Sequence, residues 1–113
     1  MALQKEIELE NGIVLKYHRI ESLNKITNIS NIIAVNSYIS EAQRQKEKEY
    51  QRVQMKNANG EELSNEEQQL LENGINVLVE ADLIQVPYDE DMIIEDAYDY
   101  LKTTDKYKDA IDI

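Results

Sequence analysis

Alternating apolar and polar residues near the start of the chain predict a β-hairpin. Two β-prone runs in residues 7–20 flank Asn11-Gly12, a dipeptide that accepts the positive φ angles of a tight type I′ turn. A two-residue loop would pair Leu9 with Val14, whereas a three-residue loop with a bulge would pair Leu9 with Leu15. The pattern therefore predicts a hairpin with Gly12 at positive φ and leaves the two registers open.

The following residues extend this sheet. The second strand is expected to continue to Ile26, a polar turn occupies residues 27–31, and residues 32–39 are rich in the β-branched residues typical of a third strand. Alternate residues of a strand share a face. One face of the third strand would therefore carry Ile33, Val35 and Ile39, and the other Ile32, Ala34 and Tyr38. A fourth strand is predicted over residues 75–86, with a bulge near Ala81-Asp82. Pro87 ends this strand because proline has no N–H to donate to a β-ladder.

Residues 41–74 separate the third strand from the fourth and are predicted to leave the sheet. Ser40 is a suitable N-cap for residues 41–56, which are mostly good helix formers with few apolar side chains. Because such a helix would bury little surface, an extended β-hairpin arm remains an open alternative for these residues.

A short helix is predicted in the second part of this excursion. Ser64 and Glu67 have the spacing of a capping box, in which each side chain accepts a hydrogen bond from the other residue's backbone. Leu70 and Leu71 would face inward. Gly74 is suited to end the helix, because glycine readily adopts the left-handed conformation found there.

A C-terminal amphipathic helix completes the pattern. Apolar residues recur at the i, i+3, i+4 and i+7 spacing of one helix face, at Ile94, Ala97, Tyr98 and Leu101. Acidic residues 89–91 come before this stripe, where the helix macrodipole favours negative charge, and Lys102 suits the other end. The tail after the helix would contribute three small apolar anchors, Tyr107, Ile111 and Ile113.

These elements predict an α+β fold. The 113 residues are in the size range of one small domain, so a single domain is expected over residues 1–113. Its architecture would be an antiparallel β-meander with a helical or charged excursion at about 41–74 and a C-terminal amphipathic helix.

Composition narrows the possible functions. The chain has 12 Lys and Arg against 23 Asp and Glu, a net charge of −11, and residues 58–113 alone carry −13. Binding to DNA or RNA requires clustered cations, so no direct nucleic-acid binding is expected. No apolar run reaches the roughly 18–20 residues that span a bilayer, and the N-terminus lacks a signal-peptide pattern, so no membrane contact is expected.

Residues with catalytic or metal-binding potential are few. The chain has no Cys and a single His, His18, which excludes disulfides, thiol nucleophiles and multi-histidine metal sites. We interpret His18 as a surface or interface residue of the second strand. The acidic run at 89–99 lacks the spacing of an EF-hand loop. We therefore predict a protein that is not an enzyme and has no catalytic, cofactor-binding or metal-binding residues.

Candidate interaction residues lie near the C-terminus. The chain has seven Tyr and no Trp or Phe, and amphipathic aromatic residues are common at interfaces. Tyr98 is expected in the core. The candidates are Tyr88, Tyr100 and Tyr107, together with the acidic residues Glu95, Asp96 and Asp99. A packed C-terminal subdomain is the alternative for the tyrosines, and a solvated helix face is the alternative for the acids.

Both ends of the chain resemble a group of small proteins from the tail modules of phages and prophages of low-GC Gram-positive bacteria. Residues 5–20, around Asn11-Gly12, are similar to the opening of these proteins. Residues 94–103, Ile-Glu-Asp-Ala-Tyr-Asp-Tyr-Leu-Lys-Thr, are similar to their aromatic-rich ending. Residues 41–74 are longer than the short charged linker of that group. The resemblance carries no catalytic motif and implies a structural or accessory role near the tail tip, baseplate or fibre.

The expected function is therefore that of a non-enzymatic tail-module protein that acts through protein–protein assembly. Its partners would be tail or baseplate components or further copies of itself. Synthesis would take place in the host cytoplasm, and the virion tail is a further expected location. The alternative is a phage-encoded acidic inhibitor of a host or defence protein, whose acidic half would mimic a nucleic acid in a basic groove.

Overall fold

The computed structural model describes residues 1–113 and has the α+β class predicted from the sequence. Its elements in chain order are β1 (Leu3–Glu8), β2 (Val14–Ile26), β3 (Ser30–Tyr38), α1 (Glu41–Ala58), α2 (Asn65–Asn73), β4 (Leu78–Pro87), α3 (Ile94–Leu101) and β5 (Ile111–Asp112). The strands form one sheet in the order β4-β3-β2-β1-β5, and all neighbours are antiparallel. The edges of the sheet are therefore β4 and the very short β5.

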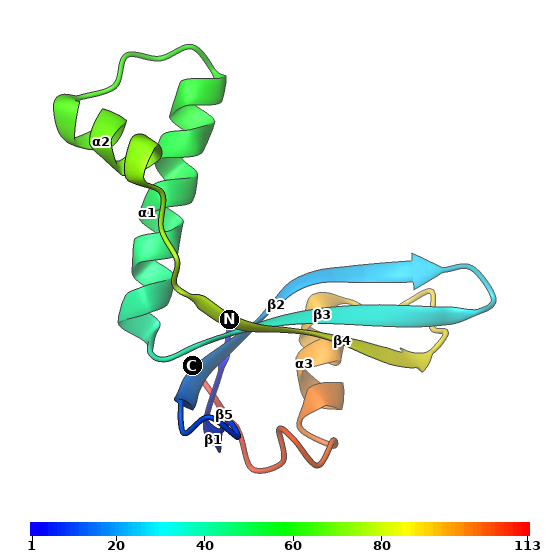
Figure 1. Cartoon of the computed structure of the whole chain (residues 1–113). Coiled ribbons are helices and arrows are strands. Elements are labelled where there is room, and N and C mark those ends of the chain that lie inside the picture. The colour runs from blue at the N-terminus through cyan, green and yellow to red at the C-terminus, as the bar shows by residue number, and fades with distance from the viewer.

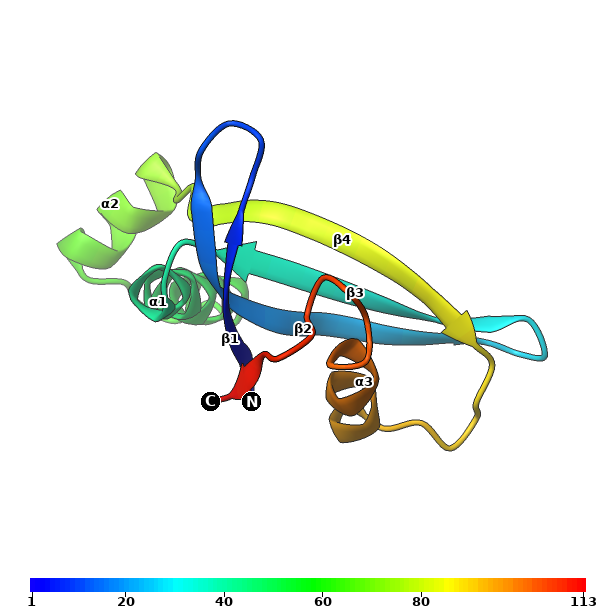
Figure 2. The same ribbon diagram turned by 90° about the horizontal axis from the view of Figure 1, so that it is seen from below.

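One helix and the C-terminal tail cover a single face of this sheet, which we call the helix-covered face. In Figure 1, α3 lies below β2, β3 and β4, and Figure 2 shows the tail returning from α3 to β1, where the two chain ends lie side by side. Ten buried residues between these layers form the main core: Leu3, Ile20, Ile33, Val35, Val86, Met92, Ala97, Tyr98, Leu101 and Tyr107.

The predicted β1–β2 hairpin is present, but both predicted registers were wrong. The Leu9 N–H donates to the Ile13 carbonyl (2.8 Å) and the Gly12 N–H donates to the Leu9 carbonyl (2.9 Å), so residues 10–12 form the loop. Of the Asn-Gly dipeptide only Gly12 has a positive φ, 87°, so the loop is a turn followed by one left-handed glycine rather than a type I′ turn. The observed register buries Leu15 completely.

The third strand ends one residue earlier than predicted. Because β3 stops at Tyr38, Ile39 lies outside the sheet, and 47% of its surface is exposed. The expectation that Ile39 shares the core face with Ile33 and Val35 was therefore wrong, although those two residues are fully buried.

The predicted bulge in the fourth strand is present at a different residue. It lies at Val79, between the paired residues Leu78 and Glu80, and not near Ala81-Asp82. The chain enters β4 at this point on its return from the excursion, and a bulge bends a strand locally.

Residues 41–74 leave the sheet as two helices, so the open choice between a helix and a β-arm is decided in favour of the helix. The predicted capping box of α2 is confirmed: the Glu67 N–H donates to the Ser64 hydroxyl (3.2 Å), and the Ser64 N–H donates to the Glu67 carboxylate (3.0 Å). Both helices project from the sheet in Figure 1. The radius of gyration, 16.3 Å, accordingly exceeds the value of about 13 Å typical of a compact chain of this length.

The acidic residues 89–91 were expected at the start of the C-terminal helix, but the helix begins after them. These residues form a turn in which the Met92 N–H donates to the Asp89 carbonyl (3.3 Å), and α3 begins at Ile94. Ile94, expected in the apolar stripe, is 43% exposed, because this first helical residue lies outside the part of α3 that packs on the sheet. The other three stripe residues are buried as predicted.

The chain ends in a strand that the sequence did not predict. β5 pairs with β1, and Ala2 and Ile113 exchange backbone hydrogen bonds of 3.1 and 3.0 Å. Tyr107 is fully buried, but Ile111 and Ile113 are exposed and do not act as apolar anchors. A two-residue strand is too short to show an alternating pattern.

Gly12→Val is expected to destabilise the protein by about 1 kcal/mol or more, because an L side chain is strained in the left-handed region. No atom lies within 4 Å of the Cβ position at Gly12, so the loss would come from the backbone and not from a clash. Gly12→Asn is the matched control and should lose less stability, since Asn adopts this conformation more readily. Urea denaturation measures both variants, and equal losses would contradict the argument.

Replacement of residues 42–74 by a linker of about six Gly and Ser residues should leave a folded body and lower the free energy of unfolding by about 1 kcal/mol. Tyr38 and Leu78 are direct neighbours across β3 and β4, so a short linker can join the two strands. The main core contains no residue of the deleted segment. Thermal unfolding followed by circular dichroism tests this, and loss of the cooperative transition would show that the excursion is needed for folding.

Candidate protein-interaction surface

Tyr107, the last of the predicted interaction tyrosines, is fully buried, so its assignment to a partner surface was wrong. Its ring packs edge-on against the ring of His18 on the helix-covered face, with centroids 5.4 Å apart. The tail closes over the sheet at this point and leaves the neighbouring Lys108 exposed. The burial of Tyr107 could not be predicted from the sequence, because the tail residues have no strand or helix periodicity.

His18 is buried as well, which corrects its interpretation as a surface residue. Its Nε2 lies 2.9 Å from the Lys5 carbonyl, which can only accept, so Nε2 carries the proton and Nδ1 accepts from the Ser37 hydroxyl at 2.7 Å. Burial lowers the pKa of His18 below its usual 6.5. The alternation of His18 with the core residue Ile20 is the signal that could have placed it inward.

The contact between Ser37 and His18 resembles the start of a nucleophile–base pair, but its surroundings are structural. Ser37 and His18 both have an exposed fraction of 0%, and the ring of Tyr107 packs against the imidazole. A group that cannot reach a substrate in solution cannot serve as its general base. The cluster therefore holds the tail on the sheet.

Tyr88 and Tyr100 are both half-buried, so part of each ring remains available to a partner. Tyr100 packs against the main core, and its carbonyl accepts a hydrogen bond from the Thr103 hydroxyl (2.6 Å). Tyr98 is in the core as expected. The three candidate tyrosines thus do not form one exposed set.

The acidic candidates Glu95, Asp96 and Asp99 all lie exposed on α3, but two of them make local contacts. Asp96 accepts a hydrogen bond from the Ile93 N–H (3.1 Å) at the start of the helix. Asp99 lies 3.4 Å from the ammonium group of Lys102. Glu95 alone of the three has neither an ion pair nor a hydrogen bond to its carboxylate within the chain.

Glu47 fastens α1 to the sheet. Its carboxylate accepts a hydrogen bond from the Tyr38 hydroxyl (2.6 Å) and forms ion pairs with Arg19 (3.4 Å) and with Arg44. Burial and the hydrogen bond to Glu47 raise the pKa of Tyr38. This network fixes the base of the helical arm on the face opposite α3.

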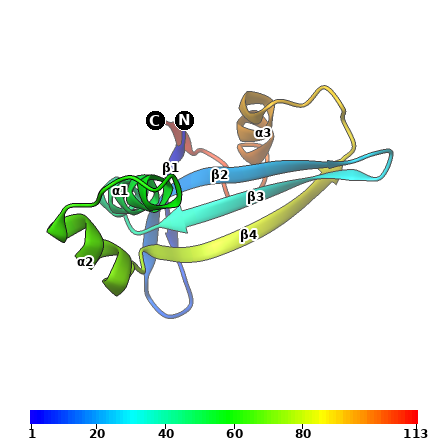
Figure 3. The same cartoon turned by 90° about the horizontal axis from the view of Figure 1, so that it is seen from above.

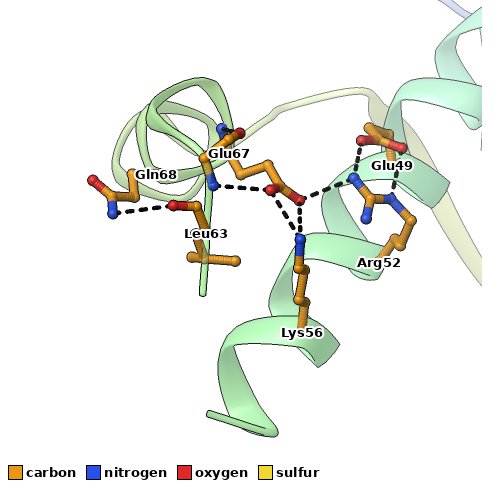
Figure 4. Close-up of polar contacts among 7 residues, drawn as sticks. Glu49, Arg52, Lys56, Leu63, Glu67 and Gln68 are labelled. Atoms are coloured by element: carbon orange, nitrogen blue, oxygen red, sulfur yellow. Dashed lines mark hydrogen bonds and ion pairs between the residues drawn. The ribbon is translucent and has the colours of Figure 1, made fainter. Parts of the chain in front are cut away.

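A second network joins α1 to α2, as Figure 4 shows. The Glu67 carboxylate lies 3.1 Å from both Arg52 and Lys56, and Arg52 also pairs with Glu49 (2.6 Å). The Ser64 N–H and these cations lower the pKa of Glu67 to about 2. The two helices therefore form one arm, held by ion pairs that salt can screen.

The sheet face opposite α3 is uncovered beyond the base of α1, as seen from above in Figure 3. Alternation with the buried residues of the strands places a mixed apolar and polar set on this face, which we call the open face: Ser22, Asn24, Ile26, Ile32, Ala34, Leu83 and Gln85. Leu83 is 73% exposed, more than any other large apolar side chain, and lies directly opposite Ala34.

The edge strand β4 borders the open face. An edge strand has a row of backbone N–H and carbonyl groups without a ladder partner, and charged side chains usually protect it. The two acidic side chains of β4, Glu80 and Asp82, both pair with Lys106 of the tail on the helix-covered face, Asp82 at 3.2 Å. Pro87, another protective residue, occupies only the last position. The centre of β4 is therefore open to a further strand.

Comparison of the chain with protein-family models, with curated proteins and with solved structures gave no match. None of the helices is both long and apolar enough to cross a membrane. No three His, Asp or Glu side chains are grouped so that they could hold a metal ion.

The stability of the protein is expected to fall as the pH drops below 6.5. Because the folded-state pKa of His18 lies below the usual 6.5, the unfolded chain binds the proton more tightly. The contribution of neutral His18 is fully present above pH 6.5 and is lost as the pH falls toward the folded-state pKa, by at most about 1.4 kcal/mol per pH unit.

Urea denaturation between pH 7.5 and 4.5 measures this dependence. His18→Gln is the control: it should be less stable at every pH but should lack the slope just below pH 6.5, since His18 is the one histidine of the chain. The same slope in both proteins would assign it to other groups.

Proposed function

We propose that this protein is a non-enzymatic structural or accessory component of a phage or prophage tail module and acts by binding other proteins. The observation that carries the proposal is the free β4 edge beside the open face, where Leu83 is 73% exposed. Partner strands add to such edges through backbone hydrogen bonds, and side-chain contacts on the neighbouring face give specificity.

The tail-module part of this proposal is supported by the resemblance of both chain ends. Residues 5–20 form much of the β1–β2 hairpin, and residues 94–103 contain α3. The two segments meet where the Ile20 N–H donates to the Tyr98 hydroxyl (2.9 Å). The residues that carry the resemblance thus belong to one packed body, and the longer excursion is an arm added to it.

In this proposal the acidic residues serve mainly solubility. A net charge of −11 keeps a protein with an open sheet edge from associating at random. The local contacts of Asp96 and Asp99 within α3 fit this role. A nucleic-acid mimic would instead depend on these carboxylates for its affinity.

A pull-down of the tagged full chain from infected cells, at low and at high salt, tests the proposal. Association through backbone and apolar contacts should persist at 1 M salt, where exposed charges are screened within about 3 Å. Mass spectrometry should then find virion tail proteins at both salt concentrations. Recovery of a basic host protein at low salt only would contradict the proposal and favour the acidic inhibitor.

Two charge variants sharpen this experiment. Leu83→Lys should lower recovery of the tail proteins by about tenfold or more, the equivalent of about 1.4 kcal/mol, whereas Glu95→Lys/Asp99→Lys should leave recovery near that of the wild type. Glu61→Lys/Glu62→Lys makes the same change of charge in the exposed segment between α1 and α2 and is the matched control.

A further inference from the structure

We propose that two copies of this chain pair through their β4 strands, antiparallel about a two-fold axis at Leu83, to form one continuous sheet. This inference rests on the proposed function, because it names a second copy of the chain as an occupant of the free edge. Closed two-fold dimers are the commonest protein assemblies, and each copy then uses the same surface.

The two-fold axis restricts the registers that β4 can adopt. Residues directly opposite each other in an antiparallel pair point to the same face of the sheet, and alternate residues of β4 point to opposite faces. A residue of the open face must therefore face another residue of the open face. The axis must consequently pass through a residue, and the four residues nearest the middle of β4 are Ala81, Asp82, Leu83 and Ile84.

Charge and apolar contact select Leu83 among these four. An axis at Ala81 would set the carboxylate of Glu80 opposite that of Asp82. An axis at Asp82 would set two carboxylates directly opposite each other, which is destabilising. An axis at Ile84 would set Leu83 against Gln85 and would pair two side chains that already pack on the main core. The axis at Leu83 sets the two leucines together and puts each Asp82 opposite Ile84 of the second copy.

This register removes the most exposed large apolar side chain from water. Leu83 is 73% exposed in the single chain, and two side chains directly opposite each other have Cβ atoms about 4.5–5.5 Å apart. Ala34 lies next to Leu83 on the open face, so an apolar strip would run across the axis from one Ala34 to the other. Pro87 would face Val79 at the end of the ladder, where its missing N–H affects only the terminal bond.

The ends of the paired strands also fit a second copy. In this register Tyr88 of one copy faces Leu78 of the other, which lines a groove against α1.

Light scattering on the purified full chain at about 100 μM gives the first test. We expect twice the chain mass of 13.2 kDa. Leu83→Glu should give the single-chain mass, because it sets two carboxylates opposite each other at the axis. Ile29→Glu is the matched control and should stay dimeric, since Ile29 is 70% exposed but lies in the β2–β3 turn. Thermal melts confirm that both variants fold.

Cysteine cross-linking tests the register, because the chain contains no Cys. Leu83→Cys should form an intermolecular disulfide within minutes under mild oxidation, since directly opposite Cα atoms fall within the 4.4–6.8 Å that a disulfide spans. Gln85→Cys should cross-link at least about tenfold more slowly. In this register position 85 of one copy lies four residues, about 13 Å, along the strand from position 85 of the other. Ile29→Cys measures cross-linking by random collision.

A single-chain mass for the wild type would overturn the proposal, and so would a dimer that Leu83→Glu leaves intact. Equal cross-linking of Leu83→Cys and Gln85→Cys would overturn the register. These experiments use purified protein alone, so they separate self-pairing from the proposed function. A monomeric wild type that still recovers virion tail proteins would remove the self-pairing and leave the tail-module role standing.

Discussion

The packing of α3 and the C-terminal tail on one face of the sheet is the interaction on which the other features of this protein depend. The Tyr98 hydroxyl joins the layers at one point, because it accepts from the Ile20 N–H and donates to the Met1 carbonyl. A helix of eight residues and a tail can cover only one face of a five-stranded sheet. The open face and the free β4 edge are therefore consequences of how the core is built.

The same C-terminal tail also changes the charge at the free edge of β4. Tyr107 covers His18, and the adjacent Lys106 forms ion pairs with both acidic side chains of β4. Unpaired acids would repel a partner strand, so closing the tail over the sheet both completes the core and makes the edge receptive. Two adjacent residues of the tail, Lys106 and Tyr107, thus connect the packing of the core with the charge of the β4 edge.

The helical arm, α1 and α2, is held by polar contacts and not by the main core. Polar contacts fasten its base through Glu47 and join its two helices through Glu67, and none of its residues belongs to the main core. Because apolar burial supplies most of the stability of a fold, such an arm can vary in length without repacking the body.

Features that depend only on neighbouring residues could be predicted from the amino-acid sequence. The hairpin with Gly12 at positive φ, the capping box of Ser64 and Glu67, and the buried stripe of α3 are local, and propensity and spacing suffice to predict them. The hairpin register, the burial of His18 and Tyr107, and the strand β5 could not be predicted in this way, because they depend on contacts between distant parts of the chain. A shift of one residue in a strand moves every side chain to the other face, and only the packing of residues distant in the sequence decides which face is buried.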